Sequence, residues 1–413
     1  MDAITLQHVN AMPAPTWHRL KMNDTDVELP EGLEQVCSVA MDVDAALIAD
    51  EGAFELAMGE MQERFEAALA AAGPRVPLAG KPATSLDDTA YSNYQIAAAA
   101  AEAEEDVAAT FETGMGNDTH AFLLEAAGAP TVIATQPGQT GAKATLHIDG
   151  IDGALNAAAI DVVAAPDSEI DVVIAFDTPE AGTGAIGATL RVFAGARSRV
   201  GITTVQTVDN DWITMDDEGY MVDDDARVEV VHTVLAGKNA YVGMAGDLRG
   251  KQADIDVQTH YLGHDENEID FNYVLRHHGV RTTCELNAQG VLADASYKNL
   301  RGTIDLIKGA KGAVGHEVET VLITDDRAHN LTVPIILCSE DDVQGNHGAT
   351  IGHIQPEQLF YLGSRGLSPE QAEDMFIRAQ LERAAIYATD DQIAAGVARL
   401  GKALLGEFEE IGE

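Results

Sequence analysis

This 413-residue chain is poor in cysteine, aromatic residues and basic residues, and each shortage argues against a class of protein. Its three cysteines, Cys37, Cys284 and Cys338, are far apart and odd in number, so they predict neither a disulfide framework nor a Cys-x-x-Cys pair. They suit a reducing environment. Only 25 basic side chains stand against 68 acidic ones, with no basic stripe to release counterions from phosphates, so we expect no nucleic acid partner.

Long apolar runs and nucleotide-binding loops are also missing. No stretch approaches the roughly 20 apolar residues of a membrane span, and residues 1–15 lack the basic and apolar regions of a secretory signal. There is no Gly-Lys-Ser/Thr loop, and Gly182-x-Gly184-x-x-Gly187 precedes a β-branched run instead of a helix, which indicates a turn. We expect a soluble, cytoplasmic protein that binds no membrane and no nucleotide.

Acidic residues dominate what is present, and the net charge is −43. Such self-repulsion destabilises a compact state, but about 1 M salt shortens the Debye length to about 3 Å. The acids are spread along the whole chain instead of forming a tail. This pattern favours a halophilic protein of a salt-rich cytoplasm over a mesophilic protein with one acidic face.

The two ends of the chain are predicted to be helical. Residues 43–71 have apolar side chains at helical spacing, and residues 93–111 are rich in alanine and glutamate, so residues 1–115 are expected to be mostly helical, with a proline-containing loop at Pro74, Pro77 and Pro82. Near the other end, Ser368 has the features of a helix cap, with Pro369 next and Gln371 three residues on. A last helix is predicted over residues 390–410.

Between these ends, residues 131–338 alternate short β-branched runs with Gly, Asp and Asn. The runs recur about every ten to fifteen residues without helical patterns between them, which argues against strand–helix units. A sandwich or barrel and a β-solenoid both remain open. Small residues at the turns, few aromatics and repeated Val and Ile favour the solenoid.

The most informative stretch is residues 341–352, Asp-Asp-Val-Gln-Gly-Asn-His-Gly-Ala-Thr-Ile-Gly, followed by residues 358–367, Gln-Leu-Phe-Tyr-Leu-Gly-Ser-Arg-Gly-Leu. These residues resemble the C-terminal signature of the SufB/SufD family, scaffold subunits of the SUF iron–sulfur cluster assembly machine. The resemblance implies a mainly β fold, with a right-handed parallel β-helix core over residues 116–345. Helical domains would flank it at residues 1–115 and 346–413.

The same resemblance gives His347 a role. Family members pair as SufB and SufD, and the nascent cluster is proposed to form at their contact, where SufB supplies a cysteine and SufD a histidine. His347 is therefore expected to bind iron or the cluster, which imidazole does well. Many SufD proteins also have a cysteine two residues earlier, but this chain has Gly345, which favours the SufD branch and leaves any thiolate to the partner.

The family resemblance also implies partners and no catalytic activity of the chain itself. A separate ABC ATPase, SufC, docks on the C-terminal helical domain of SufB and SufD. Here that surface would include Leu359, Phe360, Tyr361, Leu362 and Arg365, although Phe360 and Tyr361 equally suit a role in holding the helices to the core. We expect a non-enzymatic scaffold that pairs with a SufB-like paralogue, shares a transient iron–sulfur cluster with it, and forms a homodimer in isolation.

Other groups could bind metals but are better explained otherwise. His260 and His264 are four residues apart, yet Gly263 indicates a turn, and His277 and His278 are expected on opposite faces of a strand. Asp325-Asp326 and Asp341-Asp342 are expected to be solvated loop acids, and Cys338 a small core side chain.

Two other functions are compatible with a β-solenoid. One is a polysaccharide-active enzyme, such as a lyase, which would need basic residues aligned on one face of the rod. The other is a purely structural adaptor, in which His347 has no ligand role.

Overall fold

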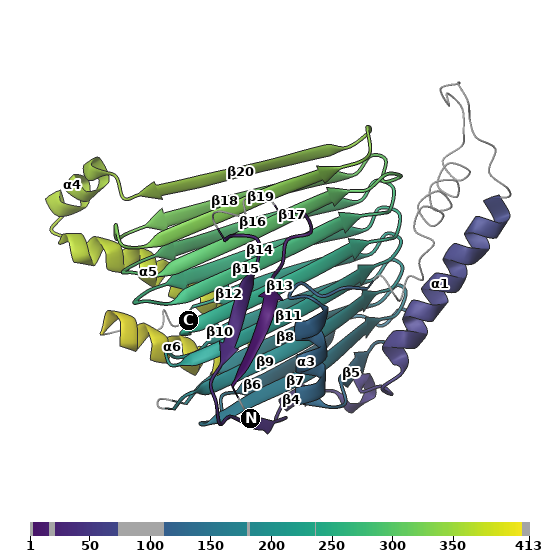
Figure 1. The fold of residues 1–413 in the computed structure, drawn as a ribbon, viewed down its shortest axis with the longest axis horizontal. Helices are drawn as coiled ribbons and strands as arrows, with labels where there is room; N and C mark the ends of the chain where they lie inside the picture. The colour runs from purple at the N-terminus through teal and green to yellow at the C-terminus, as the bar shows by residue number, and fades with distance from the viewer. Residues whose placement is uncertain (1–2, 16–20, 73–110, 180–181, 236, 407–413) are drawn as a thin grey trace.

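The computed structural model describes residues 3–15, 21–72, 111–179, 182–235 and 237–406. The fold is mainly β, as predicted, and its core is a rod of stacked parallel strands with helices at both ends of the chain (Figure 1). Strands that follow one another along the chain alternate between two sheets, so each coil of the rod contributes one strand to each sheet. The core is therefore a β-solenoid.

The two sheets are named here by their strand numbers. The even sheet runs from one end of the rod to the other as β4 (Ala40–Val43), β6 (Ala142–Asp149), β8 (Glu169–Asp177), β10 (Arg199–Thr207), β12 (Arg227–Val234), β14 (Asp254–Gly263), β16 (Thr283–Leu292), β18 (Val314–Ile323) and β20 (Gln344–His353). The odd sheet contains β3 (Glu34–Val36), β7 (Ala154–Ala164), β9 (Gly184–Ala194), β11 (Trp212–Val222), β13 (Asn239–Leu248), β15 (Glu268–His277), β17 (Tyr297–Leu306) and β19 (His329–Cys338), with β5 (Thr131–Ala134) beside β7.

The coils repeat about every thirty residues, and one turn shows this directly. Arg197 is bonded to Asp167, 30 residues earlier, through its Nε and a guanidinium nitrogen, each at 2.6 Å. Positive φ angles of 51–61° recur at turns between strands, at Asp167, Arg197, Asp225, Gln252, Asp265, Arg281 and Asp294. Asp is among the residues that tolerate this backbone region best, so the polar punctuation of the sequence marks the corners of the rod.

The inside of the rod is packed mainly with aliphatic side chains. Inward residues such as Ile174, Val230 and Leu286 are 1% exposed and form one continuous cluster along the solenoid. Burying each such side chain stabilises the fold by about 1.5–3 kcal/mol. The repeated β-branched runs thus stabilise the rod coil by coil, and polar side chains within this core are exceptions.

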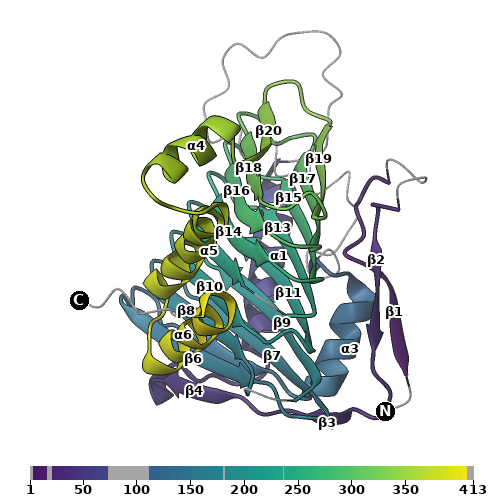
Figure 2. The same cartoon turned by 90° about the vertical axis from the view of Figure 1, so that its left-hand side faces the viewer.

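The N-terminal part of the chain covers the outer face of the odd sheet. It contributes β1 (Ile4–Val9), β2 (Thr25–Leu29), α1 (Ala53–Ala72) and α3 (Asn117–Ala127); Figure 2 shows α3 and the β1–β2 hairpin on this side. Asn10 donates to Asp270 Oδ1 at 2.7 Å, and the buried Arg301 donates to the Met22 carbonyl at 2.6 Å and to Asp270 at 2.7 Å. These bonds fix the hairpin to the rod.

The prediction of a mostly helical region over residues 1–115 is wrong for residues 4–43. Four strands lie there, and helix α1 starts at Ala53, after a short 3-10 helix at Ala45–Leu47. Residues 26–29, Asp-Val-Glu-Leu, alternate polar and apolar side chains, which is a strand signal. The other strands form because β3 pairs with β7 and β4 with β6. The predicted helix at 93–111 and the proline loop before it lie outside the described residues, except for Phe111.

The C-terminal helices are α4 (Pro356–Ser364), α5 (Pro369–Ile386) and α6 (Asp391–Leu405), so the helical part starts about ten residues after position 346. Ser368 caps α5 together with Gln371, as predicted. Helices α5 and α6 pack on the outer face of the even sheet through Leu381 and Val397 (Figure 2). Among the described helices, none is both long and apolar enough to cross a membrane.

Candidate functional site

Strand β20 is the last strand of the even sheet, at the opposite end of the rod from β4. Among the described strands it pairs only with β18, so its outer edge presents unpaired backbone groups. Nine of its ten residues are exposed and Gly352 is half-buried. The strand contains no Lys, Asp, Glu or Pro, the residues with which proteins usually protect an edge from other strands. It is therefore well suited to pair with another chain.

His347 lies in the middle of β20 with its side chain exposed. It is in register with Glu317 of β18, and side chains in register on parallel strands share a face. A Cβ atom on Gly345, two residues before and so on the same face, would lie 3.2 Å from the Ile336 side chain of the rod interior. His347 therefore lies on the inward face of the last coil and is exposed because no further coil covers it.

Below His347, the interior of the last coils contains a polar network. Glu319 is paired with Lys298 of β17, and both side chains are buried. Glu319 also accepts hydrogen bonds from the Tyr261 hydroxyl at 3.1 Å and the Thr332 hydroxyl at 2.6 Å. This network gives Glu319 partners on both carboxylate oxygens.

Glu317, directly beneath His347 in the register, is less well satisfied. Its side chain is buried, and its Oε2 atom has no hydrogen-bond partner. Burial and the neighbouring charge of Glu319 raise the pKa of Glu317 to about 8, against the attraction of Lys298. The last coil thus combines an exposed imidazole with a carboxyl that binds a proton unusually tightly.

Cys338, at this end of the rod, differs from the prediction, and position 345 is a glycine. Cys338, predicted to be a core side chain, is exposed, because it is the last residue of the terminal strand β19 and no further coil covers it. Its Sγ donates to the Glu340 carbonyl at 3.2 Å. At position 345, a cysteine side chain would start 3.2–3.3 Å from Ile336 and Leu306, so glycine there leaves these core side chains undisturbed.

Helix α4 follows β20 and carries the predicted partner-binding residues (Figure 1). Phe360 is 80% exposed and Tyr361 56% exposed, while Leu359 and Leu362 are half-buried. The Arg365 guanidinium lies 5.2 Å from the centre of the Tyr361 ring. None of the residues of α4 is buried, so the aromatic pair does not hold the helix to the rod.

The other histidines considered in the sequence have partners of their own. His260 faces α5, where it lies 3.4 Å from Arg383, and burial together with Arg383 lowers its pKa to about 4. His264 lies beyond the end of β14 and contacts Asp265, as the turn prediction requires. His277 and His278 have separate partners. His277 contacts Thr282 and Cys284, and His278 contacts Asp247.

The acidic pairs and the glycine motif are also as predicted. Arg327 donates hydrogen bonds to Asp325, and these bonds lower the pKa of Asp325 to about 2. Asp326, Asp341 and Asp342 are exposed. Strand β9 starts at Gly184, so no helix follows the glycine motif. Arg199 and Arg227 align in neighbouring coils, and both pair with Glu229.

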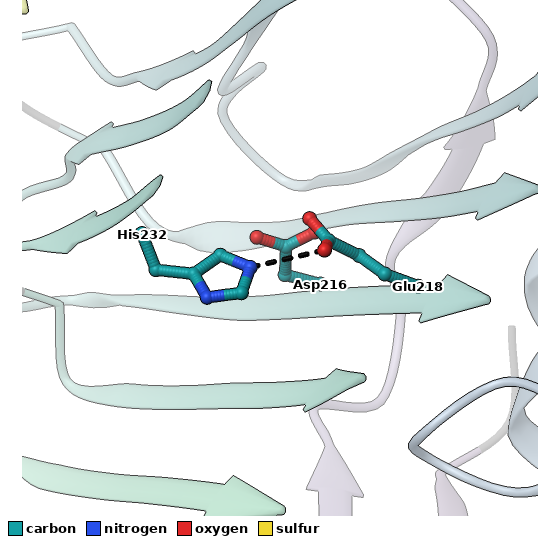
Figure 3. A group of neighbouring side chains, drawn as sticks. All are labelled: Asp216, Glu218 and His232. Carbon is teal, nitrogen blue, oxygen red and sulfur yellow. Dashed lines mark hydrogen bonds and ion pairs between the residues drawn. The ribbon is translucent and has the colours of Figure 1, made fainter. Parts of the chain in front are cut away.

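A second polar group, which was not among the predicted site residues, lies in the middle of the rod and consists of Asp216, Glu218 and His232 (Figure 3). Within the described part of the chain it is the one group of three His, Cys, Asp or Glu side chains with donor atoms within 4.8 Å of one another, and His347 belongs to no such group. A signal existed: three consecutive acids, residues 216–218, interrupt a strand whose every residue is buried.

Comparisons with known proteins point to one family. Residues 147–380 match the family model described as "SUF system FeS cluster assembly, SufBD core domain", which is more than half of the chain. The match covers most of the coils and reaches into α5.

Individual relatives match over shorter segments. The iron–sulfur cluster assembly protein SufD of Bacillus subtilis is 32% identical over 122 residues, which cover 30% of this chain and 28% of the relative. SufD of Escherichia coli is 32% identical over 117 residues, 28% of each chain. A SufBD family protein of Pyrococcus horikoshii is 30% identical over 149 residues, 35% of this chain and 29% of the relative. The matched segments thus span less than a third of each relative.

Proposed function

This chain belongs to the SufBD family of the SUF system, and we propose that it is a non-catalytic, SufD-like subunit of an iron–sulfur cluster assembly scaffold. In this proposal β20 pairs with a SufB-like paralogue, His347 binds the iron of the nascent cluster at that contact, and α4 helps to dock a SufC-like ABC ATPase. The relatives' names support the general role, since they describe assembly proteins.

The observation that carries the proposal is the unprotected edge of β20 with His347 on it. A ten-residue strand with one free edge and no charged or proline residue is suited to extend its sheet into another protein. Pairing there would cover the open end of the rod and place the partner's residues beside His347. A second copy of this chain offers the same edge, so we expect a homodimer when the paralogue is absent.

The chemistry at this contact follows from the ligand types. The cluster is cargo, and iron in it accepts thiolate and imidazole ligands. His347 supplies an exposed imidazole, and Gly345 supplies no thiolate, so the partner's cysteine would provide sulfur. Cys338 is an exposed thiol on the terminal strand β19, and its replacement by serine tests whether this chain adds a thiolate of its own.

Helix α4 supports the docking part of the proposal. Phe360 and Tyr361 expose large apolar rings next to Arg365, and such surfaces are typical of protein interfaces. With the ATPase docked on α4 and the paralogue paired with β20, ATP-driven movement of the helices would be transmitted to the nearby edge strand. Access of iron and sulfur to His347 would then depend on the ATPase.

The first experiment is co-purification of the tagged chain from its source cell in high salt. Recovery of both a SufB-like paralogue and an ABC ATPase is the expected result. Purification with neither partner would contradict the proposal.

The second experiment replaces His347 by alanine in the reconstituted complex with Fe²⁺ and sulfide. We expect the cluster yield to fall at least tenfold, because loss of a side chain that supports a metal site typically lowers metal affinity by about 10–100-fold. His353→Ala is the matched control, because His353 is also exposed on β20 but at its end. Equal cluster yields for both variants would contradict the ligand role of His347 and favour the alternative that the chain is a purely structural adaptor.

A further inference from the structure

The group Asp216, Glu218 and His232 lies within the rod, far along the sheets from β20. Asp216 and Glu218 come from β11 of the odd sheet, and His232 comes from β12 of the even sheet, so the three side chains meet across the interior (Figure 3). Asp216 is 1% exposed and the other two are fully buried. Asp217, between the two acids, faces the other side of β11 and accepts a hydrogen bond from the Met115 amide at 2.9 Å.

Glu218 has one carboxylate oxygen in use and one without a partner. Its Oε2 accepts a hydrogen bond from the Tyr220 hydroxyl at 2.6 Å and lies 3.0 Å from His232 Nε2. Its Oε1 is buried and has no hydrogen-bond partner. Leaving a buried charged oxygen unsatisfied costs at least about 1–3 kcal/mol, so this atom is suited to bind a cation or a proton.

The balance of charge in this group is also incomplete. The groups that act electrostatically on Asp216 are the two acids Glu218 and Asp217 and the single imidazole of His232. Two carboxylates with at most one positive ring are costly in a dry interior, because buried charge needs a compensating charge.

We propose that Asp216, Glu218 and His232 bind one divalent first-row transition-metal ion, such as Zn²⁺ or Fe²⁺, inside the rod. Their donor atoms lie within 4.8 Å of one another. In a tetrahedral site with bonds of about 2.1 Å, the ligand atoms lie about 3.4 Å apart, so rotations that move these atoms by on the order of 1 Å bring them to bonding distance of one ion. The free Oε1 of Glu218 supplies a fourth donor.

The surrounding side chains are arranged as the supports of a metal site usually are. His232 Nδ1 lies 3.1 Å from the Tyr273 hydroxyl, which in turn lies 2.8 Å from Thr259 Oγ1. If Nδ1 donates its proton to Tyr273, Nε2 keeps the lone pair that a metal needs. Gln206 donates to Asp216 Oδ2 at 3.2 Å and orients that carboxylate.

The donor set also selects among cations. Two carboxylates and one imidazole suit Zn²⁺, Fe²⁺ or Mn²⁺. Ca²⁺ requires six to eight oxygen ligands and Mg²⁺ keeps several waters, which a core packed with tyrosine and aliphatic side chains does not offer. This site is independent of the proposed role of His347, and its expected contribution is to the stability of the rod.

Because the group is fully buried, the ion has to enter while the chain folds. The test therefore unfolds the full chain and refolds it at high salt with Co²⁺, a spectroscopic substitute for Zn²⁺, then removes free metal by dialysis. One Co²⁺ per chain, with ligand-field absorption of oxygen and nitrogen ligands, is expected. Folded protein that retains no cobalt would overturn the proposal without recourse to any variant.

Substitutions then locate the ion. Glu218→Gln and Asp216→Asn keep the size of each side chain, and each is expected to lower the retained cobalt at least tenfold. Asp161→Asn is the matched control, because Asp161 is also a buried carboxyl of the odd sheet but is paired with Arg191. If the first two variants fold and retain as much cobalt as the control, the ion lies elsewhere and the proposal is wrong.

Discussion

The middle and the open end of the rod contain the same types of side chain under different conditions. In the middle, Asp216, Glu218 and His232 are closed in by coils on both sides. At the end, Glu317 and Glu319 are equally buried, but His347 on the next strand is exposed. In the middle and at the end of the rod, strands alternate between the same two sheets. The difference is that another coil follows in the middle and none follows at the end.

This difference separates two kinds of function. A polar group in the middle can be completed only by the chain itself or by a small ion, so changes there should affect the folding of the isolated chain. A polar group at the end can be completed by another protein, so changes there should affect assembly. The boundary between the two behaviours lies in the last coil, between the buried Lys298–Glu319 pair and His347.

The largest effect is expected from Lys298→Met, which tests whether the last coil still behaves as core. Lys298 is buried and paired with Glu319, and its loss leaves two acids without a cation. Breaking a buried pair costs about 3–5 kcal/mol of unfolding free energy, measurable by chemical denaturation. Lys143→Met, at an exposed position of β6, should cost no more than about 0.5 kcal/mol. If both substitutions lower the unfolding free energy equally, Lys298 behaves as an exposed residue and water enters the last coil.

A smaller effect is expected from pH, through Glu317. Its pKa is raised from 4.5 to about 8, so between these values the folded chain holds a proton that the unfolded chain has released. Stability should therefore fall as pH rises through this window, by on the order of 2 kcal/mol. In Glu317→Gln the melting temperature should change less between about pH 5 and about pH 8. The same slope in both proteins would contradict this assignment.

Gly348→Lys tests whether the edge of β20 is a pairing surface. A Cβ atom at Gly348 meets nothing within 4 Å, so the isolated chain should fold normally. A lysine on an edge strand opposes pairing with another strand, and at least a tenfold weaker association with the SufB-like partner is expected, about 1.4 kcal/mol. Gly59→Lys, on the exposed surface of α1 with equally open space, is the control and should bind normally.

The smallest effect on stability is expected from Phe360→Ala. Because Phe360 is 80% exposed, its replacement should change the free energy of unfolding of the isolated chain by no more than about 0.5 kcal/mol. Binding to the ABC ATPase should nevertheless weaken measurably in a calorimetric titration. A large loss of stability with unchanged ATPase binding would mean that the ring supports the fold instead.

Much of the fold could be predicted because its signals are local. The β-branched runs and the polar corners indicated a solenoid, and the Ser368 cap was read directly from its neighbours. Of the four N-terminal strands, β3 and β4 could not be predicted because they are only three and four residues long and are stabilised by pairing with β7 and β6. No local pattern of that length distinguishes a strand from a loop.

The candidate sites show the same division. The residue types around His347 mark it as a potential ligand from the sequence, but its location on the inward face of an uncovered strand depends on the coil register. Cys338 was misplaced for a related reason: its apolar neighbours suggest a core, and only the end of the rod makes it exposed.

The sequence by itself determined the strand texture, the corners and the helix cap, because each depends on side chains within a few positions. Only the tertiary structure decided which residues face one another across the rod and where the rod ends. Glu218 and His232 are 14 residues apart and lie on different sheets, and they meet because coiling brings both into one interior. Coil register and the absence of a next coil are properties of the stacked sheets, so no single strand encodes them.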